Sequence, residues 1–231
     1  MGHKKLVKFE ALETFKNVLQ FPKDIKGKWS EFFGNSYPIT LELACGKGEY
    51  SVGLGREHKD RNFIGIDIKG NRIYTGAKTA LKEGLTNVGF LRTQIARIDE
   101  YFGANEIGEI WIIFPDPFLK KESNRLTHPR FLYLYQKVMV PGGVVNLKTD
   151  SPELYESTKE FIAEAGCTVV TDIADIYGKG AATGPLAIKT FYEHMHLADG
   201  RTIYYISFRL PDTTIQLKGR FLRHAEATEG R

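Results

Sequence analysis

The sequence predicts an α/β fold, with a doubly wound, mostly parallel sheet of seven strands and helices on both faces. Short apolar runs alternate with amphipathic segments along most of the chain, and strands that alternate with helices form a parallel sheet covered on both sides. The last apolar segment, 202–210, has a different pattern, because apolar and polar residues alternate along it. We therefore expect the last strand to be antiparallel and to pair at the edge of the sheet.

The individual elements follow from the apolar pattern and from signals at helix ends. Gly84 ends one amphipathic helix, Pro129 lies in the first turn of another, and Ser151 is the expected N-cap of a third that begins at Pro152. Segment 178–200 is expected to form a loop and a short helix. The expected strands are 39–44, 62–68, 87–94, 109–115, 143–150, 168–177 and 202–210, and the expected helices are 47–58, 70–84, 96–102, 128–139 and 151–166.

Length and composition indicate one soluble domain. The 231 residues fit a single α/β domain at 34–210, with a basic N-terminal extension (1–33) and a polar C-terminal tail (211–231). Apolar residues make up 42% of the chain, but no apolar run approaches the roughly 20 residues of a membrane span. We see no secretory signal, and Cys45 and Cys167 lie in different expected elements. We therefore expect a cytoplasmic protein without disulfides and without a membrane partner.

Positive charge is concentrated in two places. Residues 1–30 carry seven lysines against three acidic residues, a net charge of +4. Residues 117–131 have a net charge of +3, from Lys120, Lys121, Arg125 and Arg130 against Glu122. The whole chain has a net charge of +4, so the remainder is acidic. Such clusters indicate a polyanionic partner, although a solvated lysine face would give the same pattern.

The first expected strand ends in a turn of small and acidic residues, ELACGKGE (42–49). Gly46 and Gly48 let the backbone approach a ligand closely. A dinucleotide-binding turn has glycine at three positions, whereas Ala44 and Glu49 occupy the first and third of them here. Acidic side chains at this turn, Glu42 among them, would repel a pyrophosphate and attract the amino and sulfonium groups of S-adenosylmethionine.

Two more strand ends complete the expected cofactor site. Asp67, at the end of the second strand, can accept hydrogen bonds from ribose hydroxyls, and Gln94, at the end of the third, can meet the adenine edge. The carboxyl ends of parallel strands meet at one edge, so these side chains would line a single crevice. The alternative is a tight turn followed by an aspartate that caps a helix.

Asp116 lies between two prolines in FPDPFLKK (114–121), directly after an apolar strand. Proline fixes its own φ and restricts the residue before it, so Asp116 has little backbone freedom. Such rigidity suits a carboxylate that must point in one direction, but the same residue types also form ordinary turns at strand ends.

Together these motifs resemble the bacterial tRNA (guanine-N7-)-methyltransferase family, whose members have a Rossmann-like fold and use S-adenosylmethionine. The resemblance covers about residues 38–210, and five stretches carry it in order: ELACGKGEY, FIGIDIKGNRI, FPDPFLKK, PGGVVNLKTD and IKTFYEH. It implies methyl transfer to N7 of a guanine in the variable loop of tRNA. It also implies that four residues surround the cofactor and the base, namely Glu42, Asp67, Gln94 and the catalytic Asp116, and that four contact tRNA, namely Lys120, Asp150, Thr190 and Glu193.

The chain departs from the family pattern at several places. Phe118 and Leu119 replace a Trp-Pro pair, Gln94 replaces an acidic residue, and Ala44 replaces a glycine. The basic run that normally follows Lys121 is shorter here. These departures bear on the contacts with tRNA more than on the cofactor site.

Several alternatives remain at the level of sequence. Asp116 could stabilise the positive charge that develops on the purine or accept hydrogen bonds from the guanine N1–H and N2–H₂ edge. The chain could also methylate an exocyclic amine or bind RNA without catalysis, while a nicotinamide-dependent oxidoreductase is disfavoured by the turn at 42–49. His194 and His196 have no third ligand at a recognisable spacing, so we expect no metal site. We expect a monomer or homodimer with no obligate protein partner.

Overall fold

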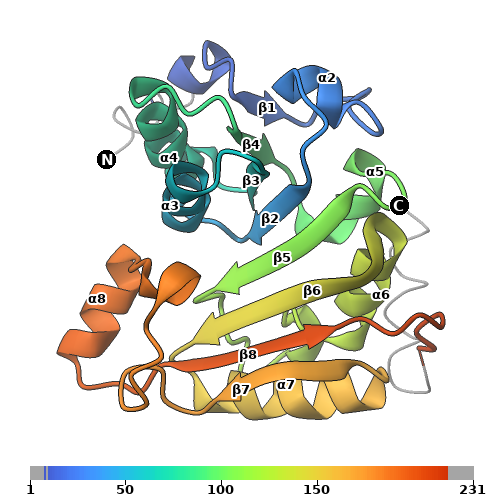
Figure 1. The fold of residues 1–231 in the computed structure, drawn as a ribbon, viewed down its shortest axis with the longest axis vertical. Coiled ribbons are helices and arrows are strands. Elements are labelled where there is room, and N and C mark those ends of the chain that lie inside the picture. The colour runs from blue at the N-terminus through green and yellow to red at the C-terminus, as the bar shows by residue number, and fades with distance from the viewer. Residues whose placement is uncertain (1–7, 9, 218–231) are drawn as a thin grey trace.

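The computed structural model describes residue 8 and residues 10–217. Its centre is one sheet of eight strands in the order β1-β4-β3-β2-β5-β6-β8-β7 (Figure 1). The strands are β1 (Val18–Gln20), β2 (Ile39–Leu43), β3 (Asn62–Asp67), β4 (Val88–Arg92), β5 (Ile107–Ile113), β6 (Met139–Thr149), β7 (Thr168–Ile173) and β8 (Tyr204–Arg209). The helices are α2 (Trp29–Phe33), α3 (Glu49–Glu57), α4 (Gly70–Lys82), α5 (Ile98–Tyr101), α6 (Pro129–Val138), α7 (Pro152–Glu164) and α8 (Phe191–Ala198), with short 3₁₀ helices at Ile95–Arg97, Glu122–Asn124 and Gly184–Ala187.

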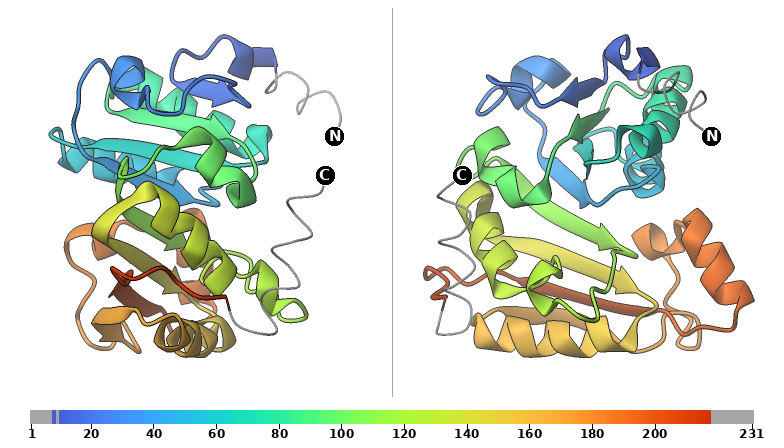
Figure 2. Two further views of the ribbon diagram at one scale, coloured as in Figure 1. Left: turned by 90° about the vertical axis from the view of Figure 1, so that its right-hand side faces the viewer. Right: turned by 180° about the vertical axis from the view of Figure 1, so that it is seen from behind.

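The two faces of the sheet carry separate clusters of buried side chains. Leu41 and Leu43 of β2 pack with residues of α2, α5, α6 and α7 on one face. Trp111 and Ile113 of β5 pack with residues of α3 and α4 on the other. Helix α6 lies behind the sheet in Figure 1 and in front of it in the rear view of Figure 2. The predicted fold class, with helices on both faces of a mostly parallel sheet, is therefore confirmed.

The position of the last strand differs from the expectation. β8 is antiparallel, as predicted, but it lies between β6 and β7 rather than at the edge, and Ile206 pairs with both Leu147 and Asp172. Residues 205–208 are all buried, which suits a strand with a neighbour on each side. β7 exposes Val169 and Val170 and forms the edge instead.

The N-terminal segment adds an eighth strand that the sequence did not predict. β1 pairs in parallel with β4, with Val18 opposite Phe90. Trp29 of α2 is almost fully buried, stacks on Phe102 at a centroid distance of 4.9 Å, and donates its indole N–H to the carbonyl oxygen of Tyr101. The described part of the basic extension is thus packed against the sheet, while Lys4 and Lys5 lie outside the described residues.

The local end signals act as predicted. Ser151 Oγ accepts a hydrogen bond from the Leu154 N–H at the start of α7, and Pro129 is the first residue of α6. Gly84 has a φ of 67°, in the left-handed region that ends many helices. Beyond β8, the side chain of Gln136 donates to carbonyl oxygens of the segment 211–213, so the start of the C-terminal tail packs on α6. Within the described residues, no helix is long and apolar enough to cross a membrane.

Candidate active site

The candidate site lies where the carboxyl ends of the parallel strands β2 to β6 meet. In Figure 1 this is the edge at which the arrows of β5 and β6 point toward α8. Five predicted site residues lie in or just beyond these strand ends: Glu42, Asp67, Gln94, Asp116 and Asp150. Because the carboxyl ends of parallel strands lie at the same end of a sheet, the fold brings these five residues, far apart in the sequence, to one end of the sheet.

The turn after β2 has an unusual backbone. Ala44, Gly46 and Gly48 have φ values of 54°, 54° and 67°, in the left-handed region that is strained for a residue with a side chain. A Cβ at Gly48 would lie 2.3 Å from a ring atom of Phe90. The turn therefore requires glycine at 48 and tolerates strain at Ala44.

Glu42 is buried beneath this turn. Its Oε2 accepts hydrogen bonds from the backbone N–H of Ser51 at 2.7 Å and from the Ser51 hydroxyl at 2.6 Å. Burial raises the pKa of Glu42 to about 7, although the two hydrogen bonds from Ser51 act in the opposite direction. A buried carboxylate at the base of a glycine turn is well placed to receive a cationic group.

Asp67 and Gln94 occupy the next two strand ends. The Asp67 carboxylate accepts backbone hydrogen bonds from Gly46 at 3.0 Å and from Lys69 at 2.8 Å. It therefore ties the turn after β2 to the end of β3. Gln94 is exposed and precedes the 3₁₀ helix at Ile95–Arg97, where its side chain makes no capping hydrogen bond.

Asp116 is exposed on a strained loop after β5. Phe114 and Phe118 have φ values of 45° and 41°, a conformation that is rare for aromatic residues and costs about 1–3 kcal/mol at each position. The Phe114 N–H donates to the carbonyl oxygen of Lys148, and the Phe118 N–H donates to Asp116 Oδ1 at 2.9 Å. The surrounding contacts hold the loop in this conformation and orient its carboxylate.

The basic cluster at 117–131 is smaller than the sequence suggests. Lys120 and Lys121 are exposed, but Arg125 is only 3% exposed and cannot meet an external phosphate. Arg130 is half-buried, its guanidinium lies 4.5 Å from the centre of the Phe131 ring, and burial lowers its pKa. Two cations of this cluster, not four, face the solvent.

Thr190 and Glu193 form the start of α8 rather than an open surface. Thr190 Oγ1 accepts the Glu193 N–H, and the Glu193 carboxylate accepts the Thr190 N–H, which is a capping box. The Glu193 side chain is fully buried, 2.6 Å from Lys148 Nζ, and accepts a hydrogen bond from the Tyr177 hydroxyl. Burial lowers the pKa of Lys148.

Asp150 is also engaged by the protein. It pairs with Arg201 at 2.7 Å and with His196 Nδ1 at 3.4 Å. His196 packs in turn against Phe114, with ring centroids 5.4 Å apart. Asp150 and α8 thus border the loop of Asp116, but the Asp150 carboxylate already has internal partners.

Sequence reasoning missed several residues that shape this site. Ser51 holds Glu42, Arg201 holds Asp150, Lys148 holds Glu193, and Arg125 contacts the Asp116 loop. Lys148 left a visible signal, because it is the one charged residue in the strand β6. Arg125 was counted with the surface charges, and no local pattern marks it as buried.

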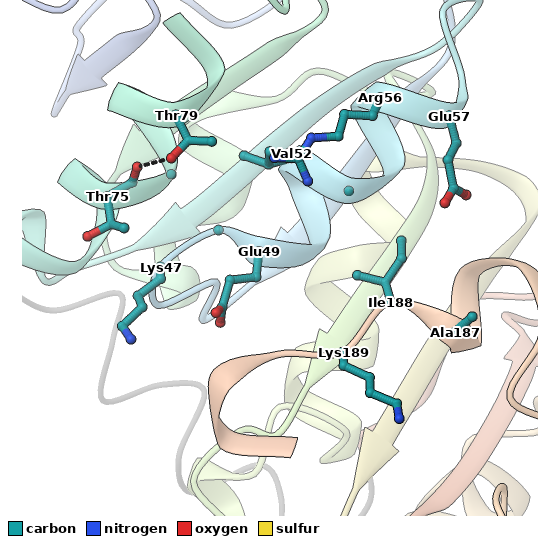
Figure 3. Close-up of a pocket in the computed structure, with 13 residues that line it drawn as sticks. Lys47, Glu49, Val52, Arg56, Glu57, Thr75, Thr79, Ala187, Ile188 and Lys189 are labelled. Atoms are coloured by element: carbon teal, nitrogen blue, oxygen red, sulfur yellow. Dashed lines mark hydrogen bonds between the residues drawn. The ribbon is translucent and has the colours of Figure 1, made fainter. Parts of the chain in front are cut away.

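A hollow lies beside the turn after β2. It has a volume of 540 Å³ and lies between α3, α4 and the segment 187–189, with Lys47 and Glu49 at one end (Figure 3). None of Glu42, Asp67, Gln94 or Asp116 lines it, but Gly48 of the turn after β2 does, so the hollow adjoins the strand-end site at this turn. Within the part of the chain that the structure describes, no group of three or more histidine, cysteine or acidic side chains is arranged to hold a metal ion.

Comparison with known structures identifies the fold. The structure of an antibiotic-related methyltransferase matches with a TM-score of 0.62 at 18% identity, over 85% of this chain and 98% of that chain. The crystal structure of a 16S rRNA methyltransferase matches with a TM-score of 0.60 at 17% identity, over 78% of this chain and 92% of that chain. The fold is that of the Rossmann-like class I methyltransferases.

Sequence comparison identifies the family. Residues 36–206 match the methyltransferase family model described as "Putative methyltransferase". A tRNA (guanine-N(7)-)-methyltransferase of Porphyromonas gingivalis is 49% identical over 211 residues, 86% of each chain. One from Bacteroides thetaiotaomicron is 46% identical over 220 residues, which cover 91% of this chain and 87% of that protein. The chain belongs to the tRNA (guanine-N(7)-)-methyltransferase family.

The buried Glu42 predicts a specific dependence of stability on pH. Its folded-state pKa of about 7 lies above the ordinary value of 4.5, so folding favours the protonated carboxyl. This stabilisation is complete below about pH 4.5 and is lost as pH rises through about 7. At 1.36 kcal/mol per pKa unit, the free energy of unfolding of the parent should fall by about 3 kcal/mol across this range because of Glu42. Glu42→Gln, which has no carboxyl to ionise, should not show this fall.

Urea unfolding of the parent and of Glu42→Gln at several pH values measures this difference. Glu57→Gln, at the exposed end of α3, is the matched control for loss of a carboxyl. If the parent and Glu42→Gln curves run parallel from pH 4.5 to 8, the raised pKa of Glu42 is wrong.

Proposed function

We propose that this enzyme transfers a methyl group from S-adenosylmethionine to N7 of a guanine in the variable loop of tRNA. The activity for which its relatives are named supports the reaction. The structural observation that carries the proposal is the exposed carboxylate of Asp116, held on a strained loop at the same edge of the sheet as the turn after β2.

The residues at the strand ends fit this cofactor. A Cβ built at Gly46 meets nothing closer than 4.0 Å, so the turn leaves room for a ligand against its backbone. We assign Glu42 to the amino group, Asp67 to the ribose hydroxyls, Gln94 to the adenine edge, and Gly46 and Gly48 to close backbone approach. When bound, S-adenosylmethionine supplies a methyl group already activated by a sulfonium.

The chemistry at guanine N7 asks mainly for alignment. N7 carries an in-plane lone pair and needs no base to remove a proton. Holding N7 in line with the methyl carbon can lower a barrier by roughly 7–11 kcal/mol. Asp116 Oδ1 is engaged by Phe118, which leaves Oδ2 for the substrate. There the carboxylate stabilises the cationic purine as it forms, or accepts the guanine edge.

Contacts with RNA phosphates contribute the rest of the binding energy for tRNA. We assign Lys120 and Lys121, next to Asp116, to phosphates near the reacting base. Four further lysines of the N-terminal segment are exposed: Lys16, Lys23, Lys26 and Lys28. Asp150, Thr190 and Glu193 support RNA binding by fixing α8, because their carboxylates and hydroxyl have partners within the protein. The cytoplasm, where tRNA is found, is the proposed location.

The first test follows the methyl label into RNA. Unmodified tRNA is incubated with labelled S-adenosylmethionine, and the nucleosides are analysed. We expect label in 7-methylguanosine and expect Asp116→Asn to lower kcat by at least about 100-fold, because removing the charge weakens transition-state stabilisation in a preorganised site. Affinity for tRNA should change little.

Asp60→Asn, an exposed aspartate at the opposite end of the sheet, is the matched control and should keep the parent rate. Label in an N2- or N6-methylated nucleoside would assign the chain to exocyclic-amine chemistry. Binding of tRNA without any label would leave a non-catalytic RNA-binding module.

The second test measures how affinity for tRNA depends on salt. Each phosphate neutralised on a single strand contributes a slope of roughly −0.7 to the plot of log affinity against log salt. Lys120→Ala/Lys121→Ala, which removes two such contacts, should therefore flatten the slope by about 1.4 and leave S-adenosylhomocysteine affinity unchanged. Lys82→Ala, at the far end of α4, is the control for loss of a lysine. An unaltered slope in the double variant would remove both lysines from the RNA interface.

A further inference from the structure

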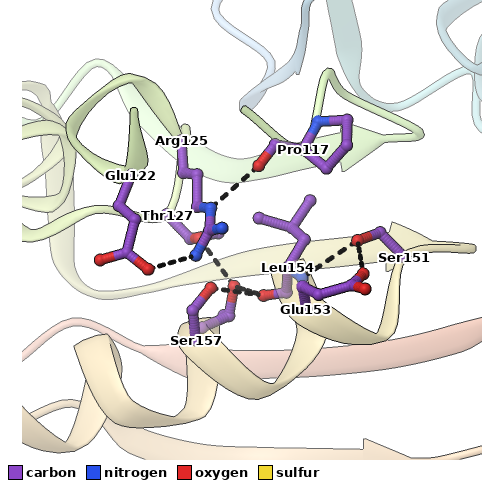
Figure 4. Close-up of polar contacts among 9 residues, drawn as sticks. Pro117, Glu122, Arg125, Thr127, Ser151, Glu153, Leu154 and Ser157 are labelled. Carbon is purple, nitrogen blue, oxygen red and sulfur yellow. Dashed lines mark hydrogen bonds and ion pairs between the residues drawn. The ribbon is translucent and has the colours of Figure 1, made fainter. Parts of the chain in front are cut away.

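Arg125 is a buried arginine that points into the loop of the candidate catalytic carboxylate. Its side chain is 4% exposed. Nε donates to the carbonyl oxygen of Pro117 at 2.9 Å, and Nη1 lies 3.1 Å from Glu122 Oε1 (Figure 4). A guanidinium has rigid, planar donor geometry, so these two contacts fix the direction in which it meets the loop.

The bond to Pro117 reaches Asp116 through a single peptide group. The Pro117 carbonyl belongs to the same planar peptide unit as the Phe118 N–H, and this N–H donates to Asp116 Oδ1 at 2.9 Å. The plane of a peptide cannot turn at one end only. Fixing the carbonyl therefore fixes the N–H that orients the carboxylate. The φ of 41° at Phe118 makes this constraint necessary, since the loop would otherwise relax toward an unstrained conformation.

We propose that Arg125 is a positioning residue, which holds the carboxylate of Asp116 in its reactive direction through the Pro117–Phe118 peptide. The inference rests on the proposed role of Asp116. It deepens that role by naming the residue that keeps the strained loop in place.

The surroundings of Arg125 exclude a role in RNA binding. The guanidinium lies beside a shallow hollow between the loop and α7, and its lining includes four glutamates, Glu122, Glu153, Glu156 and Glu160. A phosphate that approached from this side would meet negative charge before it met Arg125. The contacts of the guanidinium with Pro117 and Glu122 are both within the 117–125 loop.

Steady-state methylation of tRNA by Arg125→Met and Arg125→Lys tests the proposal. Arg125→Met removes the donor to Pro117, and we expect kcat to fall about 10- to 100-fold, as for a small misplacement of a reacting group. The KM values for S-adenosylmethionine and tRNA should stay within about twofold, because the Arg125 side chain is buried. Arg125→Lys keeps a charged donor and should recover part of kcat. It also serves as the test variant if Arg125→Met does not fold.

Arg61→Met is the matched control, because Arg61 also pairs with a glutamate, Glu109 at 2.9 Å. Arg61 lies just before β3, at the end of the strands opposite to Asp116. The variant should leave kcat unchanged. In the Asp116→Asn background, measured by single turnover, the added change Arg125→Met should cost less than about twofold, because the two residues act as one unit.

The outcomes separate the two proposals. A parent that does not methylate tRNA, or an Asp116→Asn variant as active as the parent, would overturn the proposed function. A defective Asp116→Asn variant beside an Arg125→Met variant with the parent kcat would overturn the role of Arg125 alone. So would equal kcat losses from Arg125→Met in both backgrounds, which would mean that Arg125 acts elsewhere.

Discussion

The ion pair between Lys148 and Glu193 determines where α8 lies. Lys148 is part of β6, and its fully buried ammonium lies 2.6 Å from the fully buried carboxylate of Glu193. It also donates to the carbonyl oxygens of Leu186 and Ile188. Burial of two charges costs desolvation energy that the pair must offset. Such a pair contributes most by specifying one arrangement, here the attachment of 184–198 to the sheet.

Several other contacts act on the same segment. The Tyr50 hydroxyl donates to the carbonyl oxygen of Pro185, and the Phe191 N–H donates to Glu49. Lys47 lies over the Phe191 ring, with Nζ 3.9 Å from its centre. α3, β6 and α8 are thereby joined around the strand ends. The rings of Phe191 and Tyr192 at the start of α8 remain exposed.

The parallel core was predictable because each inner strand is a buried apolar run followed by a helix with an end signal. The strand-end positions of Glu42, Asp67 and Asp116 followed from the same pattern. β1 could not be predicted, because three residues give no periodicity and, among the described strands, it pairs with β4 alone. The insertion of β8 between β6 and β7 could not be predicted either, since strand order depends on long-range pairing.

The partners of the site residues were the least predictable part. The spacing of Thr190 and Glu193 is the signature of a capping box, so their structural role was open to prediction from sequence. Lys148 and Glu193 are 45 positions apart, and only the fold brings them together. Arg125 has a neighbouring glutamate and lysines, which suggest an exposed position. Its burial depends on the packing of the 117–125 loop against α7.

A double-mutant cycle on Lys148 and Glu193 tests the role of this ion pair most directly, with free energies of unfolding measured by urea titration. Lys148→Met or Glu193→Gln alone leaves the other group buried without its charged partner, which should cost about 3–5 kcal/mol. The double variant should be more stable than the sum of the single effects implies, by at least about 2 kcal/mol. Additive losses, within about 0.5 kcal/mol, would contradict the claim that this ion pair fixes α8 at the candidate site.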